Sequence, residues 1–159
     1  CLHGKGQEKY DVVRVGVNSR LDTLQAAILL PKLAAFGDEL EKRHAVAQRY
    51  SERLKDHVAT PQLAEGDDRF AWAQYTVKVD DRDGVQARLK AAGVPSNVYY
   101  PRPMHLQSAY HEYGTGEGSL PVAEQLSQVV LSLPMHPYLT DDEIDQVSTA
   151  LISALTPKV

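Results

Sequence analysis

Apolar residues recur at helical spacing over residues 21–36, a pattern that predicts a helix. Pro31 lies inside this pattern and removes one backbone donor, so we expect it to kink or interrupt the helix. Gly37 and Asp38 predict a second break, because Asp38 is a good N-cap for a new helix that would end near His57. The helix over 21–36 is more uniformly apolar than a surface helix. It is therefore either buried in the core or covered by another subunit.

The second half of the chain alternates between strand and helix patterns. Residues 71–79 place apolar and polar side chains on opposite faces, which predicts a half-buried strand. The other predicted elements are a helix over 83–92 ended by Gly93, a strand over 96–100, a long loop over 101–119, a helix over 123–130, a strand over 131–133 and a last helix that begins with a capping box at 140–143.

These patterns predict the α/β (α+β) class, with long helices followed by a small three-stranded sheet that has helices packed on one face. We expect two parts. Residues 1–58 would form an extended segment and interdomain or interface helices, and residues 59–159 a small C-terminal α/β domain. A chain of 159 residues fits one domain or a compact half of a larger subunit.

Composition narrows the class of protein. The net charge of −4, without a basic run, argues against nonspecific binding to nucleic acid or anionic membranes. No apolar stretch approaches the roughly 20 residues that span a bilayer. Cys1 is the single cysteine, which excludes an internal disulfide and favours a reducing cytoplasm. The chain begins with Cys1 instead of Met, so we expect it to be a piece of a longer protein.

Common catalytic patterns are missing from the sequence. The six histidines show no metal-ligand spacing, so we predict no metal site. No nucleophile elbow is present. None of the eight lysines stands in an obviously apolar stretch, as a Schiff-base lysine with a lowered pKa would.

The stretch 16–27 joins a polar turn directly to a helical pattern. The first N–H groups of a helix have no internal partner and the helix dipole is positive there, so this junction suits an anion. The alternative is a purely structural cap, in which Ser19 and Asp22 form a capping arrangement and Asn18 turns the chain. Local pattern alone favours the cap.

A second candidate is the stretch 98–107, which combines aromatic, cationic and amide side chains at the end of a predicted strand. Such rings can stack on a base or a sugar, and an arginine can pair with phosphate or carboxylate. The alternative is a loop made rigid by proline, whose tyrosines cover an edge of the core. Composition and spacing do not decide between the two.

Several stretches, taken together and in this order, resemble the C-terminal part of the DegT-like nucleotide-sugar aminotransferases, which depend on pyridoxal 5′-phosphate (PLP) and have fold type I. They are 16–27, 73–77, 91–95, 100–103 and 132–137. Within the family the likeness is to transaminases of UDP-linked 3-keto hexuronic acids in bacterial O-antigen synthesis. The resemblance extends from His3 to the last helix.

This resemblance implies roles for particular residues. Asn18 would reach the PLP phosphate of the partner subunit, in a homodimer formed through the helix over 21–36. Arg20 would reach the same site and pair with a substrate carboxylate. Tyr100 matches the His-Tyr-Pro motif that contacts substrate, whereas Tyr99 replaces its usual histidine. His105 and Gln107 match a His-Leu-Gln pattern that commonly follows this motif.

The resemblance also implies what this stretch does not carry. In the family, the cofactor lysine and the aspartate that pairs with the pyridinium nitrogen precede this stretch. We therefore expect a C-terminal portion of an enzyme that transfers an amino group, with glutamate as the expected donor, to a keto-sugar nucleotide. Alone it would be inactive, with no catalytic residue and no covalently bound PLP. The alternative is a free-standing noncatalytic module that dimerises or binds nucleotide sugars. A DNA-binding helix-turn-helix is disfavoured by the acidic surface.

Overall fold

The structure, a computed structural model, describes residues 21–62, 70–110, 112–114 and 116–156. The chain divides into two compact units, Cys1–Asp38 and Glu39–Val159. The predicted parts, residues 1–58 and 59–159, stay a prediction.

Helix α1 (Thr23–Leu54) is continuous, which corrects the predicted breaks. Pro31 and Gly37 both lie inside it, and Asp38 does not cap a second helix. A glycine inside a helix costs only about 1 kcal/mol relative to alanine, and a proline costs about 3 kcal/mol. Strong helix formers such as alanine, leucine, glutamate and lysine surround both positions, and their summed preference outweighs these two local costs.

The start of α1 has a partial capping box. The backbone N–H of Asp22 donates to the side-chain carbonyl of Gln25 at 3.2 Å, and the first helical residue is Thr23. Asp22 therefore comes directly before α1. The sequence analysis had instead placed Asp22 at the end of a Ser19-x-x-Asp22 capping arrangement. Ser19 lies outside the described residues.

The first unit carries exposed large apolar side chains at Leu21 and around the first part of α1. We call the following residues the apolar helix face: Leu21, Leu24, Ile28, Leu29, Leu30, Leu33 and Phe36. Leu24 is 74% exposed and Leu33 is 72% exposed. The sequence left two interpretations of these apolar residues, burial in the core or cover by another subunit. Their exposure shows that burial in the core of this chain is wrong.

The second unit is built on a two-stranded antiparallel sheet. Strand β1 (Tyr75–Lys78) pairs with β2 (Val130–Leu133), with Tyr75 opposite Leu133 and Val77 opposite Leu131. The predicted third strand over 96–100 forms only one bridge, between Asn97 and Ser132. Pro95 and Pro101 flank this segment and have no N–H to donate to a ladder, which explains why the pairing stays short.

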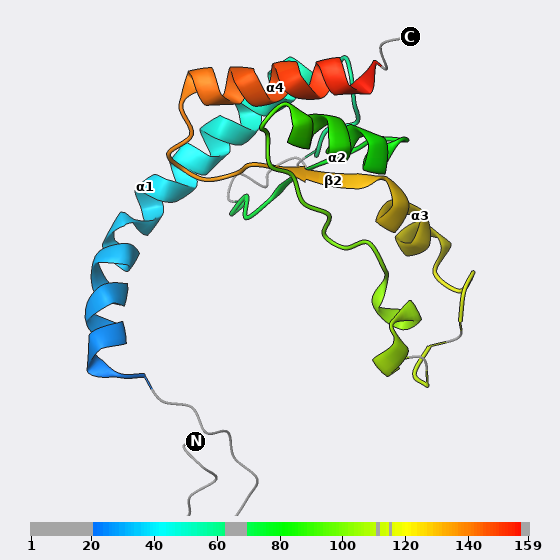
Figure 1. Cartoon of the computed structure of the whole chain (residues 1–159). Coiled ribbons are helices and arrows are strands. Elements are labelled where there is room, and N and C mark those ends of the chain that lie inside the picture. The colour runs from blue at the N-terminus through cyan, green and yellow to red at the C-terminus, as the bar shows by residue number, and fades with distance from the viewer. Residues whose placement is uncertain (1–20, 63–69, 111, 115, 157–159) are drawn as a thin grey trace, which may run out of the picture. The chain divides into compact units, whose positions relative to one another are not determined.

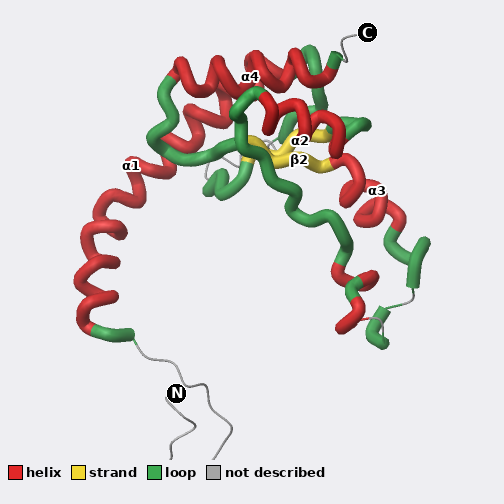
Figure 2. The backbone as a smooth tube through the Cα atoms, viewed as in Figure 1, coloured by secondary structure: helices red, strands yellow, loops and turns green. Residues whose placement is uncertain are grey.

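Helices α2 (Arg82–Ala91) and α4 (Asp141–Leu155) contact each other and lie on the same side of the sheet (Figures 1 and 2). Both were predicted from local signals that the structure confirms. Gly93 takes a positive φ of 77° just after α2, and Thr140 with Glu143 forms the complete capping box of α4. Helix α3 (Pro121–Val129) precedes β2 directly, and two short 3₁₀ turns, Met104–Leu106 and Ser108–Tyr110, lie within the predicted long loop.

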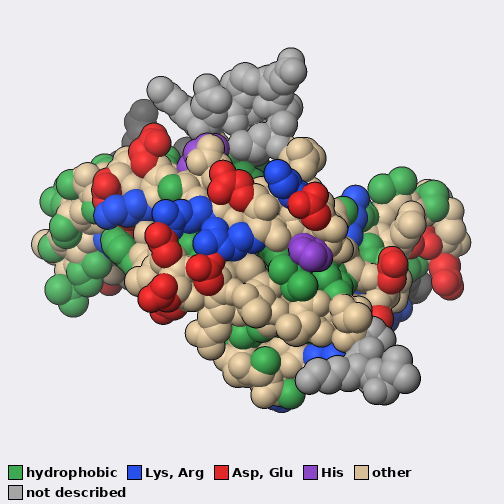
Figure 3. All heavy atoms as spheres, turned by 90° about the horizontal axis from the view of Figure 1, so that it is seen from above, with side chains coloured by type: hydrophobic (Ala, Val, Ile, Leu, Met, Phe, Trp, Pro, Cys, Tyr) green, Lys and Arg blue, Asp and Glu red, His purple; other side chains and the backbone are tan. Residues whose placement is uncertain are grey.

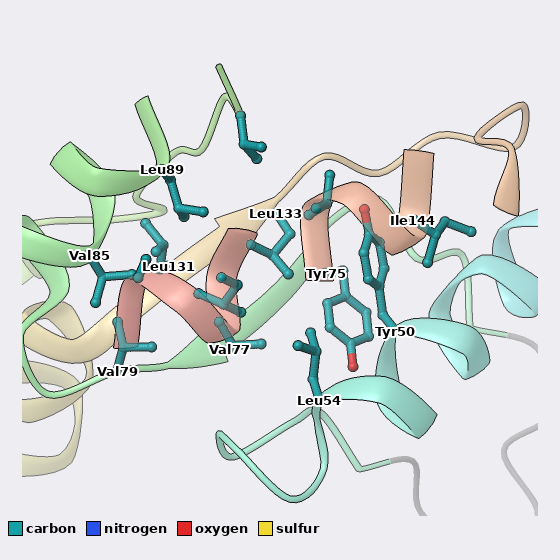
Figure 4. Packing of buried hydrophobic residues seen from close by; sticks show 14 of the residues in the cluster. Tyr50, Leu54, Tyr75, Val77, Val79, Val85, Leu89, Leu131, Leu133 and Ile144 are labelled. Atoms are coloured by element: carbon teal, nitrogen blue, oxygen red, sulfur yellow. The ribbon is translucent and has the colours of Figure 1, made fainter. Parts of the chain in front are cut away.

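The core of the second unit lies between the sheet and the helices, as Figure 4 shows. The fully buried side chains at its centre come from α1, β1, α2, β2 and α4: Tyr50, Leu54, Tyr75, Val77, Val85, Leu89, Leu131, Ile144 and Leu151. The rings of Tyr50 and Tyr75 lie 5.0 Å apart. The Tyr50 hydroxyl donates to the carbonyl of Pro134 at 3.0 Å, so the core also holds the chain that follows β2.

Charged side chains of both signs are interspersed on the face seen in Figure 3. Two ion pairs join the second half of α1 to α4: Arg49 with Asp141 and Arg53 with Asp145. All four side chains are partly exposed, so each pair contributes little to stability. No helix in the described part of the chain is long and apolar enough to cross a membrane.

Candidate functional site

Tyr99 and Tyr100 follow the short bridge at Asn97 and lie at the surface of the second unit. Their rings meet edge to face, with centroids 5.7 Å apart, and the Tyr100 side chain is 70% exposed. Because the bridge fixes the backbone at Asn97, it also positions the residues that come directly after it. The sequence left two interpretations of this stretch, a binding site and tyrosines that cover an edge of the core. The second fits the structure poorly, because both tyrosine rings remain open to solvent.

A cavity of about 280 Å³ lies where three chain segments meet. The segments are the residues before β1, the residues around the bridge at Asn97, and the end of β2 with the residues after it. Tyr99 lines this cavity; Gln74, Ser96 and Asn97 line it as well. The sequence interpretation missed these three residues as site residues. The one available signal was that Gln74 falls on the polar side of the alternating pattern over 71–79.

His105 takes part in an internal network with Glu124 at the start of α3. Its Nε2 lies 2.9 Å from a carboxylate oxygen of Glu124, and the His105 side chain is only 10% exposed. Glu124 also accepts the backbone N–H groups of Gly118, at 2.9 and 3.0 Å, and of Leu120, at 3.2 Å. An ionised carboxylate has no proton to donate, so Nε2 carries the hydrogen in this bond.

These hydrogen bonds, from His105 first and then from Gly118 and Leu120, hold the pKa of Glu124 below its ordinary value of 4.5. The network closes the loop that begins after Tyr100 onto the start of α3. The geometry thus shows His105 holding a loop. Contact of His105 with substrate stays a prediction.

Gln107 is likewise engaged within the loop, since its side-chain N–H donates to the carbonyl of Arg102 at 3.2 Å. Arg102 is exposed and lines a second cavity of about 600 Å³ between this loop and α3. Tyr99 and Tyr100 therefore lie together, while His105 and Gln107 are held by partners of their own. Asn18 and Arg20 lie outside the described residues.

The described residues do not fit a covalent PLP site. A Schiff-base lysine must be desolvated or placed beside another cation to lower its pKa. The five lysines in the described ranges, Lys32, Lys42, Lys55, Lys78 and Lys90, are all exposed. The same part of the chain contains no group of three or more histidine, cysteine, aspartate or glutamate side chains that could hold a metal ion.

The Glu124 network gives a test of loop closure. We expect Glu124→Ala to speed hydrogen exchange at the amides of Gly118 and Leu120 by roughly tenfold, because both lose a charged acceptor. Glu112→Ala, an exposed position in the same loop, is the control. The folded-state pKa of Glu124 is depressed, so its contribution is complete above about pH 4.5 and is lost as the pH falls through the lower, folded-state value. Equal exchange rates in both variants would contradict a closing role for Glu124.

Comparison with known proteins identifies the class. Residues 1–152 match the DegT/DnrJ/EryC1/StrS aminotransferase family, and the chain belongs to this family. The small antiparallel sheet with its covering helices agrees with that membership, as does the similarity to solved aminotransferase structures.

Among curated proteins, the chain is 48% identical over 150 residues to a UDP-2-acetamido-2-deoxy-3-oxo-D-glucuronate aminotransferase of Pseudomonas aeruginosa. That match covers 94% of this chain and 40% of the relative. Among solved structures, a family member from Brucella abortus superposes with a TM-score of 0.87 at 52% identity, covering 94% of this chain and 40% of that one. The DesV structure from S. venezuelae, in complex with a ketimine intermediate, gives 0.88 at 35% identity, with 97% and 42% covered. The chain thus spans about two-fifths of the length of these relatives.

Proposed function

We propose that this chain is the C-terminal part of a cytoplasmic aminotransferase that acts on a keto-sugar nucleotide. In the complete enzyme an amino group, with glutamate as the expected donor, would replace the keto oxygen of the sugar. The single observation that carries this proposal is the match of residues 1–152 to the aminotransferase family. The 48% identity with a protein named for a UDP-linked 3-oxo-glucuronate favours a hexuronic acid as the sugar.

In this proposal the stretch at the start of α1 completes the active site of a partner subunit. Asn18 would bind the PLP phosphate there, and Arg20 would pair with the substrate carboxylate, for which a guanidinium fork is well matched. The exposed apolar helix face supports a dimer, because large exposed apolar patches commonly mark protein interfaces.

PLP would be held covalently by another part of the complete protein. The cofactor supplies the electron sink that amino transfer requires. All lysines in the described ranges are exposed, which supports the expectation that this chain forms no covalent link with PLP. Tyr99 and Tyr100 would line the substrate side of the site, with His105 and Gln107 holding or extending the same loop.

Two measurements test the proposal. The intact mass of the native protein in its source cell should exceed that of the 159-residue chain, at a length near that of the curated relatives. The longer protein should then transfer an amino group to a UDP-linked 3-keto hexuronic acid. A native mass equal to that of this chain, or a longer protein without transaminase activity, would defeat the proposal.

Arg20→Ala in the longer protein is expected to reduce kcat/KM for the keto-uronic substrate by at least about 100-fold, because a buried carboxylate loses its charged partner. Activity with a matched neutral keto sugar should change by less than about threefold. The measurement is kcat/KM for both substrates with both proteins. An equal loss with the two substrates would exclude pairing between Arg20 and the carboxylate.

The second candidate is a noncatalytic module that dimerises or binds nucleotide sugars, and the exposed apolar helix face favours dimerisation. Both candidates expect no covalent PLP on this chain, so the intact mass of the native protein separates them, and titration with PLP tests the expectation that they share. A folded oligomer without a reducible, lysine-linked chromophore is the expected result. A lysine-linked chromophore would reveal a covalent site and refute our expectation for the fragment.

A further inference from the structure

The single tryptophan of the chain, Trp72, has an unusual backbone conformation. Its φ angle is 45°, in the left-handed region that bulky side chains rarely adopt. The Trp72 side chain is also only 4% exposed. Such a conformation persists only when the surrounding contacts hold it in place. The segment 70–74, which comes directly before β1, therefore depends on the contacts that Trp72 makes.

Two consecutive residues of α1 hold Trp72. A guanidinium N–H of Arg43 donates to the backbone carbonyl of Trp72 at 3.1 Å. The indole N–H of Trp72 donates to Nδ1 of His44 at 3.4 Å. An arginine keeps its charge at every pH that a folded protein meets, so the bond to the carbonyl does not depend on pH. The bond to the histidine does.

Aromatic rings from its own part of the chain also contact the indole. The ring centroids of Phe70 and Tyr75 lie 5.0 and 5.9 Å from that of Trp72. The residues from Phe70 to Tyr75 include no charged side chain. Burial raises the pKa of the Tyr75 hydroxyl above its ordinary value of 10.0, so this ring stays neutral. These ring contacts are therefore the same in weak acid and in weak base.

The bond from Trp72 requires one particular form of the His44 ring. An indole nitrogen can only donate, so Nδ1 of His44 must offer a lone pair, and the neutral ring carries its hydrogen on Nε2. A protonated imidazole carries hydrogen on both nitrogens and has no acceptor. Protonation of His44 thus replaces the hydrogen bond by two N–H groups that face each other. Histidine is the side chain that commonly changes charge between about pH 5 and 8.

The charged side chains nearest to His44 along α1 are Glu41, Lys42 and Arg43. Glu41 lies three residues earlier, and residues at this spacing are neighbours on a helix surface. Its carboxylate offers a charged acceptor to a protonated ring, which the indole cannot be. The two forms of His44 therefore have different partners, Trp72 for the neutral ring and Glu41 for the charged one.

The charges of α4 lie elsewhere around α1. Two ion pairs join the helices, Arg49 with Asp141 and Arg53 with Asp145. With 3.6 residues per turn, positions five and nine residues after His44 project from roughly the opposite side of the helix. Both carboxylates are therefore paired away from His44.

We propose that His44 is a pH-sensitive latch for the segment 70–74. The neutral ring accepts the indole N–H and holds Trp72, and the protonated ring releases it. Ala73 and Gln74 line the cavity beside the sheet, so release changes one wall of that cavity. Arg43 holds the carbonyl of Trp72 in both states, which confines the change to this segment. The latch does not depend on amino transfer, and its failure would leave the proposed function untouched.

The test is an NMR titration of the isotope-labelled 159-residue chain between about pH 8 and pH 5. Trp72 gives one indole N–H signal, because the chain has one tryptophan. This signal should shift with the same midpoint as the ring signals of His44. Its protection against hydrogen exchange, relative to free tryptophan at the same pH, should fall by roughly tenfold in acid.

Two results of this titration would overturn the latch. One is an indole signal that stays constant, or that shifts with a midpoint different from that of His44. The other is a concerted change in the amide signals of α4 at the same midpoint, which would show general acid unfolding. The amide signals of α4 are expected to stay unchanged, since the core below the segment keeps its packing.

Variants of His44 separate the latch from a merely structural role. His44→Gln keeps an acceptor oxygen but cannot titrate, so its indole signal should stay protected and independent of pH. His44→Phe has no acceptor, and its indole should be unprotected at every pH. His57→Gln, an exposed histidine shortly after α1, is the matched control and should titrate like the parent chain. An indole signal that still titrates in His44→Gln would overturn the proposal.

Discussion

Leu33→Glu is expected to convert a dimer of this chain into a monomer. Leu33 is 72% exposed in the single chain and lies on the apolar helix face, which we propose as the dimer interface. Burying a leucine contributes about 1.5–3 kcal/mol, and a buried unpaired carboxylate adds a penalty. Together these effects should raise the dimer dissociation constant by more than about 100-fold, as measured by sedimentation velocity.

Ala34→Glu is the matched control for this substitution. It introduces the same carboxylate at an exposed position on the side of α1 that holds Pro31 and Asp38, outside the apolar helix face. Its dissociation constant should stay within about threefold of the parent value, since exposed charges interact weakly. A Leu33→Glu chain that remains dimeric would show that the interface lies elsewhere on the molecule.

Leu131→Ala is expected to lower the free energy of unfolding by about 2–5 kcal/mol. Leu131 is fully buried on β2, opposite Val77, at the centre of the core in Figure 4. Its removal leaves a cavity between the sheet and the helices that the rigid strand pair cannot close. Urea denaturation should show a lower midpoint with an unchanged slope.

Val122→Ala provides the comparison, because Val122 is 69% exposed near the start of α3. Its effect should stay within about 0.5 kcal/mol, as for most surface substitutions. If the two variants were equally stable, Leu131 would not occupy the core position that the structure assigns to it.

The elements predicted correctly depend on contacts between near neighbours in sequence. The capping box of Thr140 and Glu143 lies within four residues, and Gly93 ends α2 through its own backbone conformation. The break at Gly37 failed as a prediction because its local cost is small against the preference of the long helix around it. The third strand failed as a prediction because Pro95 and Pro101, on either side of it, have no N–H to donate, which limits its pairing with β2 to one bridge.

The candidate site was predictable only in part, for the same reason. The stretch around Tyr99 and Tyr100 could be singled out by its composition at a strand end. The contact between His105 and Glu124 joins residues 19 positions apart, so no local pattern reveals it. Similarly, Gln74 and Asn97 meet at one cavity only because β2 lies between their segments.

The hydrogen bond from Tyr50 to Pro134 links the interior of the second unit to the rim of the cavity, since Pro134 is one of the cavity residues. Loss of the Tyr50 hydroxyl would therefore release the chain that follows β2 and, with it, one wall of that cavity. A substitution in the interior would in this way change the shape of the surface.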